Sequence, residues 1–106
     1  MAKASTKSST HIVAFTGGDY KPKRLASGLI GLRAPFPFSL KPLSGQTIDL
    51  GSKCQVGLLL DTGKIISPGQ NIMIDVYNSA GAPVAYEAGE VIARAYPLLV
   101  PDYEIK

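Results

Sequence analysis

The sequence predicts an all-β fold, and two observations support that prediction. Eleven glycines and eight prolines interrupt the chain so often that no window of about ten or more residues shows an uninterrupted helical period of apolar residues. Short runs of alternating apolar and polar residues occur instead, at intervals of roughly ten residues. About seven to nine short strands at that spacing are typical of a sandwich or a small barrel.

Residues 71–78, "NIMIDVYN", show the clearest alternation. Ile72, Ile74 and Val76 are predicted to face the core, and the residues between them to face solvent. The other predicted strands are "HIVAF", "FPFSL", "QTIDL", "VGLLL", "VAYE" and "VIARAYPLLV". The segments between them have the composition of turns: "KPLSGQ", "DTGK", "SPGQ", "NSAGAP" and "EAGE".

The run "FPFSL" places Phe36, Phe38 and Leu40 on one face of a predicted strand. Pro37 has no N–H to donate to a neighbouring strand. It is therefore expected at a sheet edge or at a bulge.

The chain of 106 residues is long enough for one domain with one core. We expect residues 11–106 to form that domain. Residues 1–10, "MAKASTKSST", bury too little apolar surface to order themselves and are expected to form a flexible basic arm. Cys54 is the only cysteine, which excludes a disulfide within one chain.

No apolar run approaches the about 20 residues that a membrane helix needs, and no hydrophobic stretch follows the N-terminal lysines. The sequence therefore predicts no membrane partner and a cytoplasmic location, or a place in the virion if the protein is viral.

The net charge of +3 is unevenly distributed. Residues 1–24 contain five basic residues and one acid, whereas the rest of the chain is close to neutral. A basic segment of this kind can contact an acidic surface, which makes its cations the candidate partner-binding residues. These are Lys3, Lys7, Lys21, Lys23 and Arg24. The near-neutral remainder does not favour nucleic-acid binding by the folded part.

From about Pro22 to Pro101 the chain resembles the dUTPase family. "SGLIGLRAPFPFSLKPLSGQTIDLG" is similar to the family's first motif and the strands after it. "GKIISPGQNIMIDVYN" is similar to the third-motif region, and "VAYEAGEVIARAYPLLVP" to the segment that ends in a terminal proline. The resemblance implies a compact fold shared with dCTP deaminases, β-clip or jelly-roll-like, and a homotrimer.

The catalytic residues of that family are not found in this sequence. In the register that keeps "LRA", Gly31 stands where the family has an Asp near the metal, and the phosphate-binding second motif is missing between Gly51 and Lys64. No acid or aromatic residue lies between Thr62 and Ile74, where the third motif has its Asp and Tyr. Asp61 is the nearest carboxylate, and its place before Thr-Gly favours a turn-capping role.

Other reaction chemistries have no better support. His11 and Cys54 make at most two zinc ligands, fewer than a zinc site requires. Cys54, at the edge of an apolar run, is expected to pack as a small hydrophobic residue. The sequence predicts no catalytic, metal or cofactor-binding residue and no cofactor.

The sequence therefore favours a non-enzymatic structural or interaction protein on a dUTPase-like scaffold. The leading hypothesis is a trimeric virus or phage capsid decoration protein, with a larger protein assembly such as a capsid surface as its partner. Two alternatives stay open. One is a divergent dUTP-hydrolysing enzyme that uses Asp61 or Asp49, and the other is a nucleotide-binding regulatory module without turnover.

Overall fold

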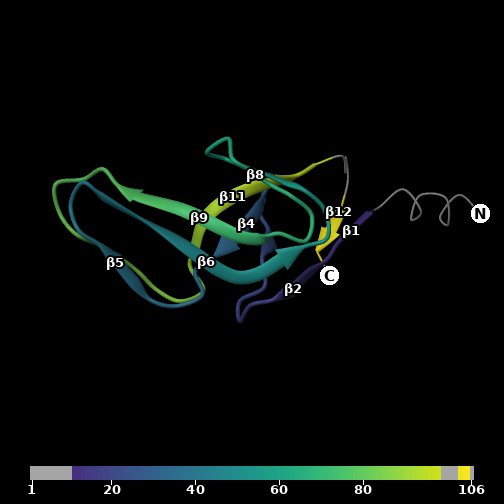
Figure 1. The fold of residues 1–106 in the computed structure, drawn as a ribbon, viewed down its shortest axis with the longest axis horizontal. Coiled ribbons are helices and arrows are strands. Elements are labelled where there is room, and N and C mark those ends of the chain that lie inside the picture. The colour runs from purple at the N-terminus through teal and green to yellow at the C-terminus, as the bar shows by residue number, and fades with distance from the viewer. Residues whose placement is uncertain (1–10, 99–102, 106) are drawn as a thin grey trace, which may run out of the picture.

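The computed structural model describes residues 11–98 and 103–105, and this part of the chain contains twelve strands and no helix (Figure 1). The strands are β1 (His11–Val13), β2 (Phe15–Gly17), β3 (Lys23–Arg24), β4 (Ile30–Arg33), β5 (Phe38–Leu40), β6 (Ser44–Cys54), β7 (Leu58–Leu60), β8 (Ile65–Ile66), β9 (Asn71–Asn78), β10 (Val84–Tyr86), β11 (Val91–Pro97) and β12 (Tyr103–Ile105). The all-β prediction is confirmed. The expected number of strands was too low, because several strands have only two or three residues and lack a readable alternation.

Most of the domain is one long two-stranded ribbon that bends twice (Figure 1). In order along this ribbon, β4 pairs with β11, β5 pairs with β10 and β6 pairs with β9, and all three pairs are antiparallel. Backbone hydrogen bonds hold the first bend, from Ala34 N to Glu90 O at 2.7 Å and from Gly89 N to Ala34 O at 2.8 Å. The second bend is the tip of the molecule, where β5 turns into β6 and β9 into β10 (Figure 1).

The hydrogen-bonded sheets stay open. Two larger sheets have the strand orders β3-β4-β11-β7-β8 and β2-β6-β9, and two smaller pairs are β10-β5 and β1-β12. The expectation of a sandwich or barrel is corrected in one respect, because no sheet of the described residues closes on itself. Each sheet ends instead at an edge strand such as β8, β3 or β9.

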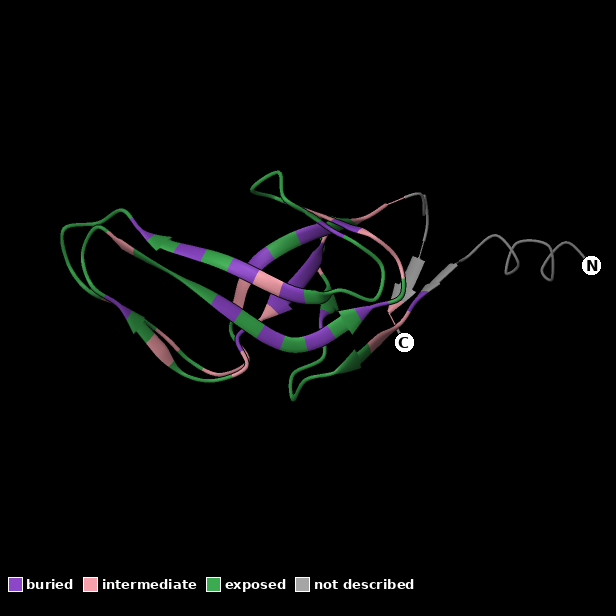
Figure 2. Cartoon of the chain, viewed as in Figure 1, coloured by how far each residue is buried: buried purple, intermediate pink, exposed green. Residues whose placement is uncertain are grey.

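The core lies between the inner faces of the two larger sheets. Buried and exposed residues alternate along β6 and β9, so each strand has one face in the core and one in solvent (Figure 2). The predicted inward side chains Ile72, Ile74 and Val76 are buried, as expected. They join one cluster with the inward residues of β4, β7 and β11.

The strand predicted at "QTIDL" is longer than expected and runs from Ser44 to Cys54. Its register with β9 shifts between Asp49 and Lys53, where a bulge adds residues to β6. Gly51 has φ +71°, and its N–H donates to Asp49 Oδ1 at 2.9 Å. The bulge keeps Ser52 and Cys54 on the buried face, which lets the strand continue.

The strand predicted over "FPFSL" begins only at Phe38. Leu40 is buried and Phe38 half-buried, but Phe36 remains 45% exposed. The prediction that all three share one face of a strand was therefore wrong for Phe36, which lies before the strand. Because Pro37 cannot donate to a neighbouring strand, pairing starts after it.

The run "HIVAF" divides into two strands at Ala14. β1 pairs in parallel with β12, whereas β2 pairs antiparallel with β6. Both described ends of the chain therefore lie together, at the end of the molecule opposite the tip (Figure 1). The predicted arm, residues 1–10, lies outside the described residues.

Candidate functional site

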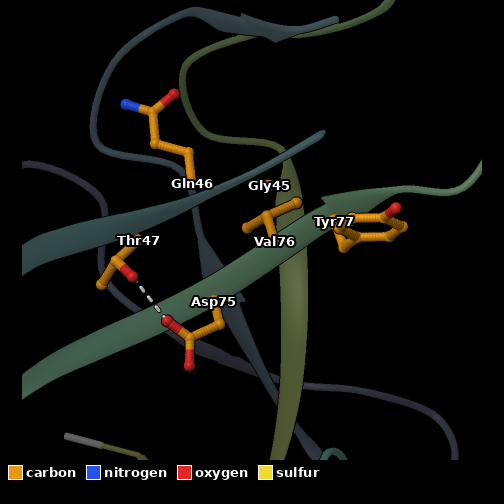
Figure 3. A pocket seen from close by; sticks show the side chains of 6 residues that line it. All are labelled: Gly45, Gln46, Thr47, Asp75, Val76 and Tyr77. Atoms are coloured by element: carbon orange, nitrogen blue, oxygen red, sulfur yellow. Dashed lines mark hydrogen bonds between the residues drawn. The ribbon is translucent and has the colours of Figure 1, made fainter. Parts of the chain in front are cut away.

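Two hollows lie along the second half of β9 and share Asp75, Val76 and Tyr77. The first has a volume of about 310 Å³ and lies over the β6–β9 ribbon, where Gly45, Gln46 and Thr47 complete its lining (Figure 3). The second has a volume of about 220 Å³ and lies between β9, the β7–β8 turn, β10 and β11. We call the second one the β9 groove.

Thr47 and Asp75 connect the two strands of the ribbon. They are register partners, so their side chains project from the same face of β6 and β9. Thr47 Oγ1 donates to Asp75 Oδ1 at 2.6 Å, as Figure 3 shows. The other carboxylate oxygen, Oδ2, lies 4.0 Å from Lys64 Nζ. Asp75 is therefore held in place and still offers an exposed anionic oxygen.

Tyr77 extends along the same face beside Gly45, its register partner (Figure 3). A Cβ at Gly45 would lie 3.1 Å from Tyr77 Cδ1 and 3.1 Å from Val76 O. The missing side chain thus makes room for the tyrosine ring to approach the ribbon. The Tyr77 side chain is exposed and available to a partner.

The β9 groove combines acids with aromatic and aliphatic side chains. Its lining takes Asp61 and Thr62 from the β7–β8 turn, Tyr86 from β10, and Ile92 and Ala93 from β11. Tyr86 is fixed by stacking on Phe38, with ring centroids 4.8 Å apart. Asp61 N donates to Arg94 O at 2.8 Å, which anchors the turn to β11.

The groove thus offers negative charge next to apolar surface. Asp61 and Asp75 supply negative charge, and the tyrosines and Ile92 supply apolar contact. Across residues 11–98 and 103–105, no group of three or more His, Cys, Asp or Glu side chains is placed to hold a metal ion. In the same residues, no helix is long and apolar enough to cross a membrane.

The cations proposed from the sequence lie elsewhere. Lys21, Lys23 and Arg24 are exposed along and just before β3, the edge strand of the five-stranded sheet. The Lys21 carbonyl oxygen accepts a hydrogen bond from Arg33 Nη1 at 3.3 Å. Lys3 and Lys7 lie outside the described residues. The structure thus brings three of the five candidates onto one edge and none of these three into the hollows.

Asp61 and Asp49, the two acids considered as catalytic from the sequence, lie at different places in the structure. Asp61 lines the β9 groove together with Asp75, a residue predicted from the sequence only to face solvent. Asp49 lines neither hollow, because its carboxylate accepts the Gly51 N–H at the bulge. Nothing in the spacing of Asp61 and Asp75 along the chain signals that they line one groove, since the fold of β7–β9 brings them there.

Gly31 has a packing role. An added Cβ there would lie 3.0 Å from Leu25 Cδ2 and 3.1 Å from Val91 Cγ2. The position at which the resemblance expects a metal-associated Asp is therefore closed over by two apolar side chains. Arg33, two residues on, is also structural, since its Nε donates to Gly89 O at 2.8 Å and its guanidinium lies 5.4 Å from the Tyr20 ring centroid.

Cys54 belongs to the core, as predicted. It is a free thiol with 1% of its surface exposed. Burial raises the pKa of the Cys54 thiol, although hydrogen bonds with the backbone of Val56 and Gln55 oppose the shift. A protonated, enclosed thiol is a poor nucleophile.

A second surface feature lies on the outer face of the five-stranded sheet. Tyr96 is the register partner of Leu59, and Leu59 is the partner of Ile65. The three side chains therefore form one row across β11, β7 and β8, which we call the apolar row. Tyr96 is 55% and Ile65 59% exposed, whereas Leu59 between them is half-buried.

Comparison with models of protein families, with curated proteins and with solved structures gives no match to this chain.

Proposed function

We propose that this protein is a non-enzymatic structural protein that works as a homotrimer on the surface of a larger particle, in the manner of the proteins that decorate virus and phage capsids. Self-association through a sheet face and attachment through a basic edge are the two properties that such a role requires. Each has a candidate surface among the described residues.

The observation that carries the proposal is the apolar row. Three large apolar side chains lie side by side on a sheet face, with Tyr96 and Ile65 more than half exposed. Large apolar side chains grouped on a surface favour contact with another protein, because covering them removes apolar area from water. In a closed oligomer the same row on each copy is covered by its neighbour.

The basic edge supplies the attachment surface. Lys21, Lys23 and Arg24 are exposed on the rim of the five-stranded sheet. Cations grouped on an edge attract an acidic particle surface and guide association, an effect that salt weakens. They also discourage unwanted strand pairing at β3.

The scaffold is proposed to be dUTPase-like, as the sequence resemblance implies. The twice-bent ribbon, in which the strands from β4 to β6 pair with those from β11 to β9, supports this reading. A fold of this kind does not fix a function, so the trimer has to be tested directly.

Light scattering on the peak from size-exclusion chromatography tests the proposal. The full chain is expected to elute as a trimer. Tyr96→Lys and Ile65→Lys place a charge in the apolar row and are expected to shift the protein toward monomer. Ala26→Lys adds the same charge at an exposed position away from the row and serves as the control.

A trimer that persists in both row variants would place the interface elsewhere. A wild-type chain that stays monomeric at every concentration tested would overturn the proposal.

Nucleotide hydrolysis is a second candidate function, favoured by the presence of Asp61 and Asp75 in one groove beside Tyr77 and Tyr86. Turnover of dUTP with Mg²⁺ by the wild type, lost in Asp61→Asn, would support it. Absence of turnover would leave binding alone, which a rise in melting temperature with uracil nucleotides would reveal. If no nucleotide shifts the melting temperature, this candidate fails in both forms.

A further inference from the structure

We infer that the tip of one copy docks on the apolar row of the next copy, with Leu43 as the side chain that enters the row. This inference rests on the proposed homotrimer and identifies the surface that covers the apolar row.

A trimer needs two different contact surfaces on each copy. In a two-fold dimer one patch faces the same patch of its partner, whereas around a three-fold axis a contact away from the axis joins one patch to a different patch of the next copy. The apolar row supplies one of the two patches. Its counterpart lies elsewhere on the chain and has to offer apolar surface, because only apolar surface gains from displacing water from the row.

Four large apolar side chains of the described residues are exposed outside the row. These are Tyr20, Phe36, Leu43 and Tyr77. Three of them already contact their own chain. The Tyr20 ring centroid lies 5.4 Å from the Arg33 guanidinium, and Phe36 meets Phe38 edge to face with ring centroids 6.3 Å apart. Tyr77 lies beside Gly45. Leu43 is the most exposed of the four, which makes it the strongest candidate for the counterpart.

The backbone of Leu43 supports this choice. Leu43 follows Pro42 in the turn between β5 and β6 and has a left-handed conformation, with φ +55°. Gly or Asn is favoured at such a position, because other side chains clash there with their own backbone. A leucine costs the separate chain free energy twice, through backbone strain and through exposed apolar surface. Strained residues cluster at binding sites, where the strain is part of the function.

The tip presents Leu43 from a fixed turn. Ser44 Oγ donates to Lys41 O at 2.7 Å within this turn. Asn78 Nδ2 donates to Lys41 O at 3.2 Å and to Ala82 O at 2.8 Å, which joins the turn to the one between β9 and β10. Lys41 is the only charged residue of the two turns, 41–43 and 79–83. A fixed and nearly uncharged tip loses little conformational entropy and little hydration when a partner covers it.

The apolar row has room for one leucine side chain. Neighbouring strands lie about 4.8 Å apart, so Tyr96 on β11 and Ile65 on β8 are about 10 Å apart across β7. Leu59 between them is half-buried, whereas both flanking side chains are more than half exposed. The middle of the row is therefore lower than its ends, and an apolar side chain that enters there contacts all three residues.

The tip and the apolar row lie on different parts of one copy. The tip is at one end of the molecule, whereas β8 and β11 lie in its body (Figure 1). This separation is what a head-to-tail contact around a closed ring requires, because each copy then gives its tip to one neighbour and its row to the other.

Cross-linking between two full-length variants tests this inference. One chain carries Lys41→Cys, two residues before Leu43, and the other carries Ser67→Cys, two residues after Ile65 of the row; both positions are exposed. The two chains are mixed at a dilution that gives monomers, concentrated and treated with a short bis-maleimide. We expect a cross-linked pair of chains from the mixture and none from wild type, because Cys54 is buried.

Each cysteine variant alone is the matched control for the direction of the contact. A head-to-tail contact brings position 41 of one copy to position 67 of the next, so neither variant alone is expected to give a cross-linked pair. Pairs from Lys41→Cys alone would show tip against tip, and pairs from Ser67→Cys alone would show row against row. Either result overturns the inference.

Leu43→Asn separates the contact between copies from the fold of one copy. Asn tolerates the left-handed backbone but removes the apolar side chain. The melting temperature of the diluted monomer is expected to stay the same or rise. The concentration at which half of the chains are assembled is expected to rise about ten-fold or more, as when a contact loses a buried leucine.

Phe36→Asn removes an exposed apolar side chain outside both surfaces and is the control for this assay. The inference fails if Leu43→Asn assembles at the wild-type concentration. It also fails if Phe36→Asn shifts assembly as much as Leu43→Asn does, because the effect then reflects exposed apolar surface in general.

Failure of this inference and failure of the proposed function are distinguishable, because light scattering measures the oligomeric state of the same samples. A trimer that gives no cross-linked pair between positions 41 and 67 overturns the inference and leaves the proposed function intact. A wild-type chain that stays monomeric overturns both.

Discussion

Asn78 donates from its side-chain Nδ2 to the carbonyl oxygen of Leu40, 38 residues earlier in the sequence, at 3.3 Å. The same nitrogen lies 3.2 Å from Lys41 O and 2.8 Å from Ala82 O, and Asn78 Oδ1 accepts from Ala80 N at 2.9 Å. One buried amide therefore joins the two turns at the tip of the molecule.

Asn78→Ala is expected to lower the free energy of unfolding by about 2 to 3 kcal/mol, because partly buried backbone groups lose their partner. Asn78→Asp keeps an acceptor for Ala80 N but has no amide to donate, so it is expected to be destabilising as well. Urea denaturation measures both changes. Equal stability of Asn78→Ala and wild type would show that water replaces the amide at no cost.

Gly31→Asp introduces an acid at the position where the sequence resemblance implies one, and we predict loss of stability without gain of activity. The new side chain must fit between Leu25 and Val91, and overpacking of this kind costs about 2 kcal/mol. Gly31→Ala adds only the Cβ and is expected to cost about 1 kcal/mol. Urea denaturation and a dUTP turnover assay with Mg²⁺ check the two parts. Turnover in Gly31→Asp would contradict the assignment of this position to packing.

Leu43 has a left-handed backbone, with φ +55°, and is 68% exposed at the tip. Leu43→Gly is expected to raise the free energy of unfolding by about 0.5 to 1 kcal/mol, since a left-handed conformation costs other residues about 1 to 2 kcal/mol and glycine gives back part of that in entropy. Leu43→Val is expected to change stability in the opposite direction, because a β-branched residue fits this region poorly. Thermal unfolding distinguishes the two signs.

Burial of Cys54 predicts a loss of stability at alkaline pH. Because the pKa of the thiol is higher in the folded than in the unfolded protein, unfolding releases a proton once the pH exceeds the unfolded value, about 9. Below that pH this loss of stability is absent, and above it the free energy of unfolding falls as the pH rises toward the folded pKa. Urea denaturation between about pH 7 and pH 10.5 should show a steeper decline for wild type than for Cys54→Ala. Parallel curves would mean that the thiol does not contribute.

The local pattern of apolar and polar residues was sufficient to predict a strand and its buried face where one face of the strand is buried and the other exposed. Residues 71–78 alternate strictly, and burial follows that alternation at Ile72, Ile74 and Val76. The same reasoning located the turns, because Gly, Pro, Asn and Asp favour the backbone conformations that turns need. It was weaker at Phe36, where the proline that follows delays pairing, and at β3 and β8, which are too short to show a period.

The amino-acid sequence by itself determined the all-β class, the inward face of β9 and the placement of Cys54 in the core, because strand periodicity and hydrophobic burial act locally. Only the tertiary structure decided which strands pair, including the parallel contact of β1 with β12. It also decided that Asp61, Asp75 and Tyr86 line one groove and that Leu25 and Val91 close over Gly31. These contacts join segments far apart in the chain, and their geometry depends on the two bends of the ribbon, which no local pattern of residues encodes.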